Sequence, residues 1–477
     1  MRFSSRHLSL LLVALATSVA CAVRPAAIGA PDATTSSTAS IDALIGRGCF
    51  RCLTQAYDAA VEAGQRNRTF EAALLLAARA KELGLPFAPW LERARAALPV
   101  GPDWTDYLAI VEALRIDPLA DDRDAVLVDT LKHRASPQTV AGWRADLTSG
   151  AGSPRLRAYL ELSLVCQYVV EDRNVTVAAI VQRFHDVPLV EYRAGACGPS
   201  QASHLAAVRE AVPEFTDVDF VLGRYAVDVP RQPDQAEALR RFAAARAAFP
   251  ESPAIVASLA ALHRDREEWT DALDAYDVTL MLVPTHRDAL LGRTVALSHL
   301  LRHDDAIANA TRIIDLGSWF TGEAYYWRAW NEYHLARIED ARTDTDRAKG
   351  LMHNASVLTL SGMIEWHERR FDASESELQE ALTLDAGQCE AAFLLGAVRA
   401  ERRQWASGAA AFELAQRCYD LSVTLRRETI ARITAGSGTE EGKARQIARQ
   451  QRAMTEEAQH RDEAAQNAVN LQRRGGV

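Results

Sequence analysis

The sequence predicts an all-α protein built as a solenoid of helical hairpins, and three observations lead to that prediction. A small residue recurs with a period of about 34 residues, at Ala238, Ala272, Ala306, Ala341, Ser374 and Gly408. Four and seven residues after each of them come further residues on the same helical face. Twelve residues before, from the second marker onward, stands another small residue: Ala260, Thr294, Ala329, Gly362 and Gly396. Paired helices that pack through small residues and repeat side by side form a solenoid.

The offsets resemble one known family. The positions that carry the likeness are Ser258-Leu259-Ala260, Trp269, Ala272, Tyr276, Leu280 and Pro284, and again Leu395-Gly396, Trp405, Gly408, Phe412 and Ala415. They are similar to the tetratricopeptide repeat (TPR), and five units are readable from about Pro253 to Tyr419. Three central units depart from the pattern, with Arg293, Arg328 and Ser361 in place of Leu, and Ala310 and Thr345 in place of an aromatic residue. The resemblance implies a right-handed solenoid that binds partners through its concave face.

The chain begins like an exported protein. Arg2, Arg6 and His7 precede the apolar run Leu8–Ala16, and small residues lead to Cys21, which is typical of a secretory signal peptide. Cys21 resembles the acylated cysteine of bacterial lipoproteins. We therefore expect a periplasmic or outer-membrane-tethered lipoprotein of a bacterium. Ordinary cleavage near Ala20 or Ala22, leaving an exported protein without a lipid, is the alternative.

Five parts of the chain follow from these patterns. We assign residues 1–20 to the signal peptide, 21–40 to a tether or linker, 41–215 to an irregular α-helical region, 216–420 to the TPR-like array and 421–477 to a capping helix with a polar C-terminal helix or tail. The irregular region includes one divergent repeat at about 48–86. It is read as a solenoid that has lost its sequence signal, or as a separate helical domain. A helix at about Leu421–Thr434 is expected to cover the last repeat, and Gly436-Ser437-Gly438 to end it.

Composition and motifs exclude several function classes. The net charge of −9 over 477 residues provides no basic footprint, so we expect no nucleic-acid partner. The sequence lacks G-x-S-x-G, and His367-Glu368 lacks the second histidine of a zinc protease motif. Residues 436–443 have misspaced glycines for a phosphate-binding loop. We expect no catalytic residue, no cofactor and no metal.

Six cysteines remain after Cys21, as suits disulfides in an oxidising compartment. Cys49 and Cys52 form a local pair; a redox or metal role is the alternative. Cys166 and Cys197 are each other's nearest candidates. Cys389 and Cys418 begin and end one hairpin, so antiparallel helices should bring them together, unless both are simply small buried residues.

Aromatic residues gather at the positions that line the concave face in arrays of this kind. The predicted partner-binding groove is Leu291, Tyr326, Trp330, Tyr333, His334, Met363, Trp366, His367 and Phe393. Histidine also occupies one equivalent position in three successive units, at His299, His334 and His367. This row binds a polar partner, holds a metal, or is a coincidence of three polar residues. The N-terminal helices or the C-terminal helix could instead fold over and bury the aromatic groove.

These features favour a non-enzymatic scaffold that binds a protein or peptide of the cell envelope through its groove, with a membrane contact through the N-terminal lipid if Cys21 is acylated. A binding protein for a small ligand or a glycan, using the same aromatic residues, is the alternative. A third reading is an enzyme with an unrecognised site in the N-terminal half.

Overall fold

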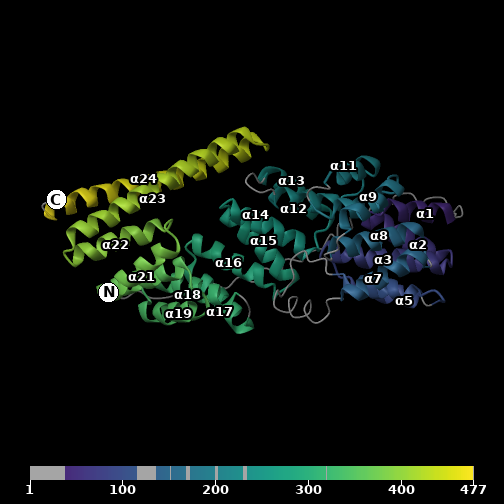
Figure 1. Cartoon of the computed structure of the whole chain (residues 1–477), viewed down its shortest axis with the longest axis horizontal. Coiled ribbons are helices and arrows are strands. Elements are labelled where there is room, and N and C mark those ends of the chain that lie inside the picture. Colours follow the sequence, from purple (N-terminus) through teal and green to yellow (C-terminus); the bar gives the residue numbers. More distant parts are fainter. Residues whose placement is uncertain are drawn as a thin grey trace, which may run out of the picture.

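A computed structural model describes residues 38–101, 103–114, 136–150, 152–167, 172–198, 202–228, 234–317 and 320–475. The 23 elements in these ranges are all α-helices, and no strand occurs among them. The helices follow one another along an elongated molecule, with α1 to α11 at one end and α16 to α24 at the other (Figure 1). The predicted all-α hairpin solenoid is therefore confirmed.

The N-terminal helices form a bundle around one buried helix. They are α1 (Thr38–Arg47), α2 (Phe50–Glu62), α3 (Arg66–Glu82), α4 (Ala88–Ala96), α5 (Asp103–Ala113), α7 (Pro137–Ser149), α8 (Pro154–Gln167), α9 (Arg173–Arg183), α10 (Pro188–Gly195) and α11 (Ala202–Ala211). Every residue of α3 from Phe70 to Glu82 is buried. Helices α1, α2, α4 and α5 all pack against it. A helix enclosed on every side is the centre of a bundle, so this region differs from a stack of hairpins.

The repeats follow as consecutive antiparallel pairs. Their helices are α12 (Val218–Asp228), α13 (Gln235–Ala248), α14 (Pro253–Asp265), α15 (Trp269–Leu282), α16 (Arg287–His299), α17 (His303–Leu316), α18 (Thr321–His334), α19 (Ile338–Leu351), α20 (Ala355–His367), α21 (Phe371–Leu384) and α22 (Cys389–Glu401). Each of them packs against the next. Glycine permits this approach: a Cβ built at Gly396 of α22 would lie 2.7 Å from the ring of Phe412.

The turn inside each hairpin has the same backbone conformation in all five units. Glu267, Leu301, Ala336, Arg369 and Arg403 have φ between 58° and 61°. The amide of the next residue donates to a carbonyl five positions earlier, as in Glu268 N to His263 O at 2.8 Å and Arg302 N to Leu297 O at 2.9 Å. This left-handed cap ends one helix and aims the next one back along it. The constant turn explains why the hairpins repeat regularly although no glycine occupies it.

The C-terminal helices correct one prediction. Helix α23 (Trp405–Ala435) runs unbroken for 31 residues, so the separate helix expected at 421–434 is its second half. Gly436 ends α23, as predicted, and α24 (Glu440–Gly475) returns alongside it. Ala464, Ala468 and Leu471 of α24, rather than residues 421–434, cover the apolar edge around Phe412 and Ala415. Helix α23 continues without a break because no helix-breaking residue stands between Tyr419 and Gly436.

All three predicted cysteine pairs lie at disulfide distance. The Cα atoms are 5.0 Å apart in Cys49–Cys52, 5.1 Å in Cys166–Cys197 and 5.3 Å in Cys389–Cys418. The last pair joins the start of α22 to the middle of α23, as antiparallel pairing requires.

Two helices were missed from the sequence. Helix α1 begins at Thr38, inside the segment assigned to the tether, and α10 lies within the region 41–215, where the sequence shows no regular period. Residues Leu189 to Gly195 of α10 are all buried, so they lack the polar face that makes a helix visible in a sequence. The signal peptide, most of the tether and Cys21 lie outside the described residues. Among the helices in the described ranges, none has both the length and the apolar character needed to cross a bilayer.

Candidate functional site

The predicted groove residues lie on the first helices of successive hairpins, α16, α18, α20 and α22. A row of touching rings joins α15, α16, α18 and α20. Ring centroids are 3.9 Å apart in Trp269–His299, 6.1 Å in His299–Trp327, 5.3 Å in Trp327–Tyr326, 6.4 Å in Tyr326–Trp330, 4.8 Å in Trp330–His334, 5.8 Å in His334–Tyr333 and 6.2 Å in Tyr333–His367. We call these eight side chains the aromatic row. Such offset and edge contacts hold the rings in fixed positions before any ligand arrives.

The aromatic row stays partly open to solvent. Tyr326, Trp330 and Tyr333 are half-buried, with one side packed on the core that includes Leu360 and Ile364. His334 and His367 are exposed. Large rings that are fixed on one side and wet on the other are suited to bind an apolar or planar group.

The remaining predicted groove residues divide between surface and core. Met363 is only 7% exposed and belongs to the core between α18 and α20, so its assignment to the groove is wrong. Leu291 packs on the core around Leu290 and Ile313 and is half-buried. Trp366 and Phe393 are also half-buried, and Phe393 contacts Phe412 edge-on at 5.2 Å. Met363 has the same helical spacing as the groove residues, but it is buried in a core that also contains Ala329 of α18 and Ala341 of α19.

The histidines of the row meet other rings rather than one another. His299 stacks on Trp269, and burial lowers its pKa. His334 stacks on His303 with centroids 5.4 Å apart, and its pKa is lowered by burial and then by His303. Lowered pKa values keep these imidazoles neutral near pH 7. They therefore present uncharged donors and acceptors beside the aromatic rings.

Metal-ligand geometry in the described ranges occurs at a different place. His263, Glu268 and Asp271 have ligand atoms within 4.8 Å of one another. Glu268 is already paired with Arg266 at 3.1 Å and with His263 at 2.6 Å. Burial opposes ionisation, but these hydrogen bonds and charges lower the pKa of Glu268 to about 2. An arginine held against this carboxylate opposes a cation, so we assign no metal to the cluster.

One acidic residue that sequence reasoning missed faces the row. Glu390 stands at the start of α22. Its side chain remains accessible to solvent, but the protein atoms that surround the carboxyl partly desolvate it and raise its pKa. Burial, and secondly Glu390, raise the pKa of Tyr326 to about 12 and raise that of Tyr333. The charge of His460 in α24 partly offsets this effect by lowering the pKa of Glu390. The His460 ring lies 5.5 Å from the ring of Tyr419 in α23. The C-terminal helices thus face the same space as the aromatic row.

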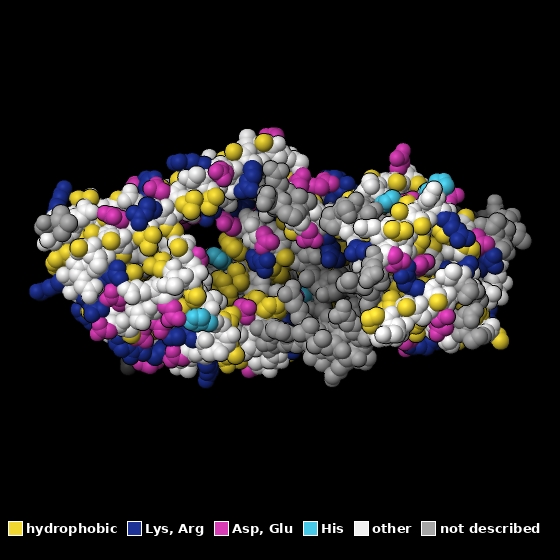
Figure 2. Space-filling model, in the orientation of Figure 1, with side chains coloured by type: hydrophobic (Ala, Val, Ile, Leu, Met, Phe, Trp, Pro, Cys, Tyr) yellow, Lys and Arg dark blue, Asp and Glu magenta, His cyan; other side chains and the backbone are white. Residues whose placement is uncertain are grey.

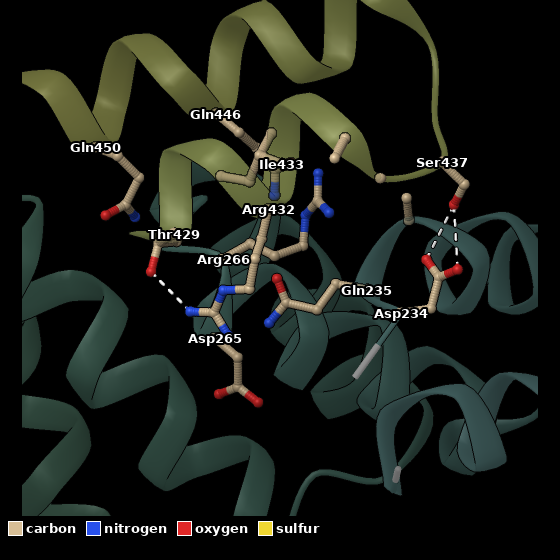
Figure 3. Close-up of a pocket in the computed structure, with 13 residues that line it drawn as sticks. Asp234, Gln235, Asp265, Arg266, Thr429, Arg432, Ile433, Ser437, Gln446 and Gln450 are labelled. Atoms are coloured by element: carbon tan, nitrogen blue, oxygen red, sulfur yellow. Dashed lines mark hydrogen bonds between the residues drawn. The ribbon is translucent and has the colours of Figure 1, made fainter. Parts of the chain in front are cut away.

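The hairpin of α23 and α24 crosses from the last repeat back to the first, above the concave face of the array (Figure 1). Its tip lies against α13 and α14, where the two parts line a half-open cavity of about 510 Å³ (Figure 3). Figure 2 shows an opening between this hairpin and the repeats, with hydrophobic side chains and a histidine on its wall. The concave face is therefore a channel bounded by repeats on one side and by the hairpin on the other.

Comparisons with known proteins give distant structural likenesses. No protein-family model and no curated protein matches the chain. Solved structures that resemble it include a tetratricopeptide repeat protein from Parabacteroides merdae ATCC 43184, with 15% identity, 62% of this chain and 99% of that chain covered, and a TM-score of 0.39. Another is the Cut9–Hcn1 hetero-tetramer of APC/C (12% identity, 91% and 89% covered, TM-score 0.36), and a third is yeast Tom70 (12% identity, 88% and 92% covered, TM-score 0.34).

The fold is assigned from the hairpins of this chain. Five units of about 34 residues share one turn conformation, close helix packing at small residues and a concave row of first helices. The fold is TPR-like. TM-scores below 0.5 give no information about binding partners. The ligand of the channel is therefore inferred from the side chains that line it.

Proposed function

We propose that the protein is a non-enzymatic scaffold that binds an extended segment of a partner protein along its aromatic row. The observation that carries the proposal is the unbroken series of rings from Trp269 to His367, in which half-buried Trp and Tyr side chains alternate with exposed histidines and each ring is held by its neighbours. Rings fixed in advance lose little conformational freedom on binding. An extended segment fits because the row passes over several hairpins and offers successive places for its side chains.

Selection of linear peptides tests this proposal. A displayed library of random linear peptides is bound to the purified protein, and the selected peptides are measured by calorimetry on the wild type and on a Trp330→Ala, Tyr333→Ala variant. Tyr325→Ala is the matched control, because Tyr325 is on the same helix but contacts Arg328 and Arg347 instead of the row. Loss of binding in the double variant alone supports the proposal.

Two results contradict it. Peptides that bind the double variant as tightly as the wild type use another surface. Binding to a glycan array that depends on Trp330 and Tyr333, without peptide binding, supports the alternative of a glycan-binding protein, since sugars also stack on aromatic faces. Thermal melting of each variant first shows that it is folded.

We further propose that the scaffold works in a bacterial cell envelope, tethered through a lipid on Cys21. The signal-like residues before Cys21 support this location. Cys21→Ser should move the protein from the membrane fraction to the soluble fraction and remove a diacylglyceryl mass. Unchanged membrane association, with no lipid on the wild type by mass spectrometry, contradicts the tether.

A further inference from the structure

The hairpin of α23 and α24 contacts the array at two places, the last repeat and the first repeats, and the two contacts differ in kind. At the end near the last repeat, Leu471, Ala468 and Ala464 are at most 5% exposed and pack on Phe412 and Ala409. Gln472 adds a hydrogen bond of 2.8 Å to Glu413. Separation here would expose a continuous apolar surface to water, which opposes it strongly. This end is the fixed attachment.

The contacts at the tip are polar and partly wet. Ser437 Oγ donates to Asp234 at 3.0 Å, and Arg449 reaches the carbonyl of Arg266 at 3.3 Å and the carboxylate of Glu268 at 3.5 Å. Arg426 lies 3.5 Å from Glu267, in the left-handed turn of the first full repeat. All these groups regain hydrogen bonds from water when the tip moves away, so each contact contributes little to closure.

The tip of the hairpin and the first repeats are also not closely packed against each other. Thr429, Arg432, Ile433, Gln446 and Gln450 of the hairpin line the cavity opposite Asp234, Gln235 and Arg266 (Figure 3). Protein interiors and permanent interfaces are close-packed. The half-open cavity of about 510 Å³ at this junction therefore makes the contact at the tip looser than the fixed attachment.

From this asymmetry we propose that the α23–α24 hairpin is a hinged strap, fixed at the last repeat and latched at the first, that controls entry to the aromatic channel. The inference rests on the proposed function of that channel. With 31 residues, α23 is about 46 Å long, enough to span several hairpins. A partner segment with a free end threads the closed channel, whereas a segment between folded domains enters only when the latch opens.

Access to the channel can be measured without any partner. Ser356 stands one repeat before Glu390, at the start of α20, and is exposed. Replacing it with an alkyne-bearing amino acid places a reactive group in the channel that does not interfere with the cysteines. Its reaction rate is compared for a small azide and for an azide attached to a folded protein. The small azide should react equally in every form, and the bulky one should react slowly when the latch is closed.

We call the contacts of Ser437 and Arg449 with the first repeats the latch. One kind of variant should weaken the latch, and another should lock it. Arg449→Gln removes a partly exposed ion pair with Glu268, so it should raise the rate of the bulky azide about two- to fivefold, as should added salt. Arg452→Gln, at an exposed position of the same helix, is the control and should change nothing. A disulfide between Ala236→Cys and Gly438→Cys, where a built Cβ lies 3.3 Å from that of Ala236, should reduce the rate to background.

Gly438 has φ of 120°, so a second locked form guards against a strained loop. Asp234→Cys with Ser437→Cys joins side chains that meet at 3.0 Å. The strap is disproved if the bulky azide reacts equally fast with locked and unlocked protein. Because the assay uses no partner, gated access without peptide binding would refute only the proposed function. Peptide binding with ungated access would refute only the strap.

Discussion

Arg79 is the largest fully buried side chain in the described ranges, and its partners come from distant parts of the chain. Its guanidinium pairs with Glu82 one turn later in α3 and with Asp217 at 2.6 Å. It also lies 3.6 Å from the centre of the Tyr192 ring in α10. Glu82 receives further hydrogen bonds from Tyr159 and Arg193, both at 3.0 Å. One residue thereby ties the N-terminal bundle to the start of the array.

Removing that charge should destabilise the protein strongly. Arg79→Met leaves Glu82 and Asp217 as buried carboxylates that have lost a positive partner, at a cost of about 3–5 kcal/mol. Urea unfolding measures the loss. Arg47→Met is the control, because its pair with Glu214 is exposed and should contribute far less. Equal effects of the two substitutions would contradict the role given to Arg79.

Glu332 in α18 gives the array a dependence on pH. Burial, and next the carboxylate of Asp344, raise its pKa from 4.5 to about 7, against the attraction of Arg328. Its Oε2 has no hydrogen-bond partner among the described residues. A folded-state pKa above the unfolded value means that ionised Glu332 costs stability. That cost is absent below about pH 4.5, grows as the pH rises to about 7, and is constant above.

Glu332→Gln should therefore stabilise the protein only at higher pH. We expect a gain of about 1–3 kcal/mol at pH 8 and none at pH 4.5, measured by urea unfolding at both values. Glu339→Gln, at an exposed position of α19, should show no such dependence. A gain that is the same at both values would show that the amide acts through packing instead of charge.

At the scale of elements, the hairpins depend on how closely two helices approach. Gly292 in α16 faces the buried ring of Tyr276 in α15, and a Cβ built there would lie 2.1 Å from the ring carbon that bears the hydroxyl. Gly362 and Gly396 meet Leu378 and Phe412 in the same way, at 2.6 Å and 2.7 Å. Gly362 and Gly396 belong to the 34-residue period, whereas Gly292 lies outside it and serves the contact between two successive hairpins.

Gly292→Ala should consequently lower stability although alanine favours a helix. The ring of Tyr276 is only 2% exposed, so overpacking should cost about 1–3 kcal/mol, more than the gain of about 1 kcal/mol in helix propensity. Gly350→Ala in α19, where no atom lies within 4 Å of the added Cβ, should raise the melting temperature. The opposite signs of the two shifts are the test.

At the scale of the whole molecule, the C-terminal helix completes the solenoid. A stack of hairpins ends in an apolar face that needs a cover. Helix α24 covers it with three residues, and its remaining length carries the tip of the hairpin back to the first repeat. The cap and the proposed strap thus belong to the same helix, which runs from Glu440 to Gly475 with three buried residues near its C-terminal end.

Leu471→Ala should loosen the cap. Leu471 is 5% exposed, and its loss should cost about 2–5 kcal/mol and raise hydrogen exchange across α24. The uncovered edge should also promote self-association, visible by light scattering. Val469→Ala, two residues away and 39% exposed, is the control. Exchange confined to the first turn of α24 would contradict its anchoring at Leu471.

The sequence by itself determined the hairpins, their period, the end of α23 at Gly436 and the closeness of Cys389 to Cys418, because these depend on spacings within one or two helices. The inner position of Tyr326, Trp330 and Tyr333 followed from the same spacing. Tertiary structure decided the burial of Met363, the buried helix α10 and the charge network of Arg79. It also decided the closure of the channel, where Ser437 meets Asp234 across 203 residues. The curvature of a solenoid is the sum of small rotations between successive hairpins, so where its two ends meet is fixed only by all of them together.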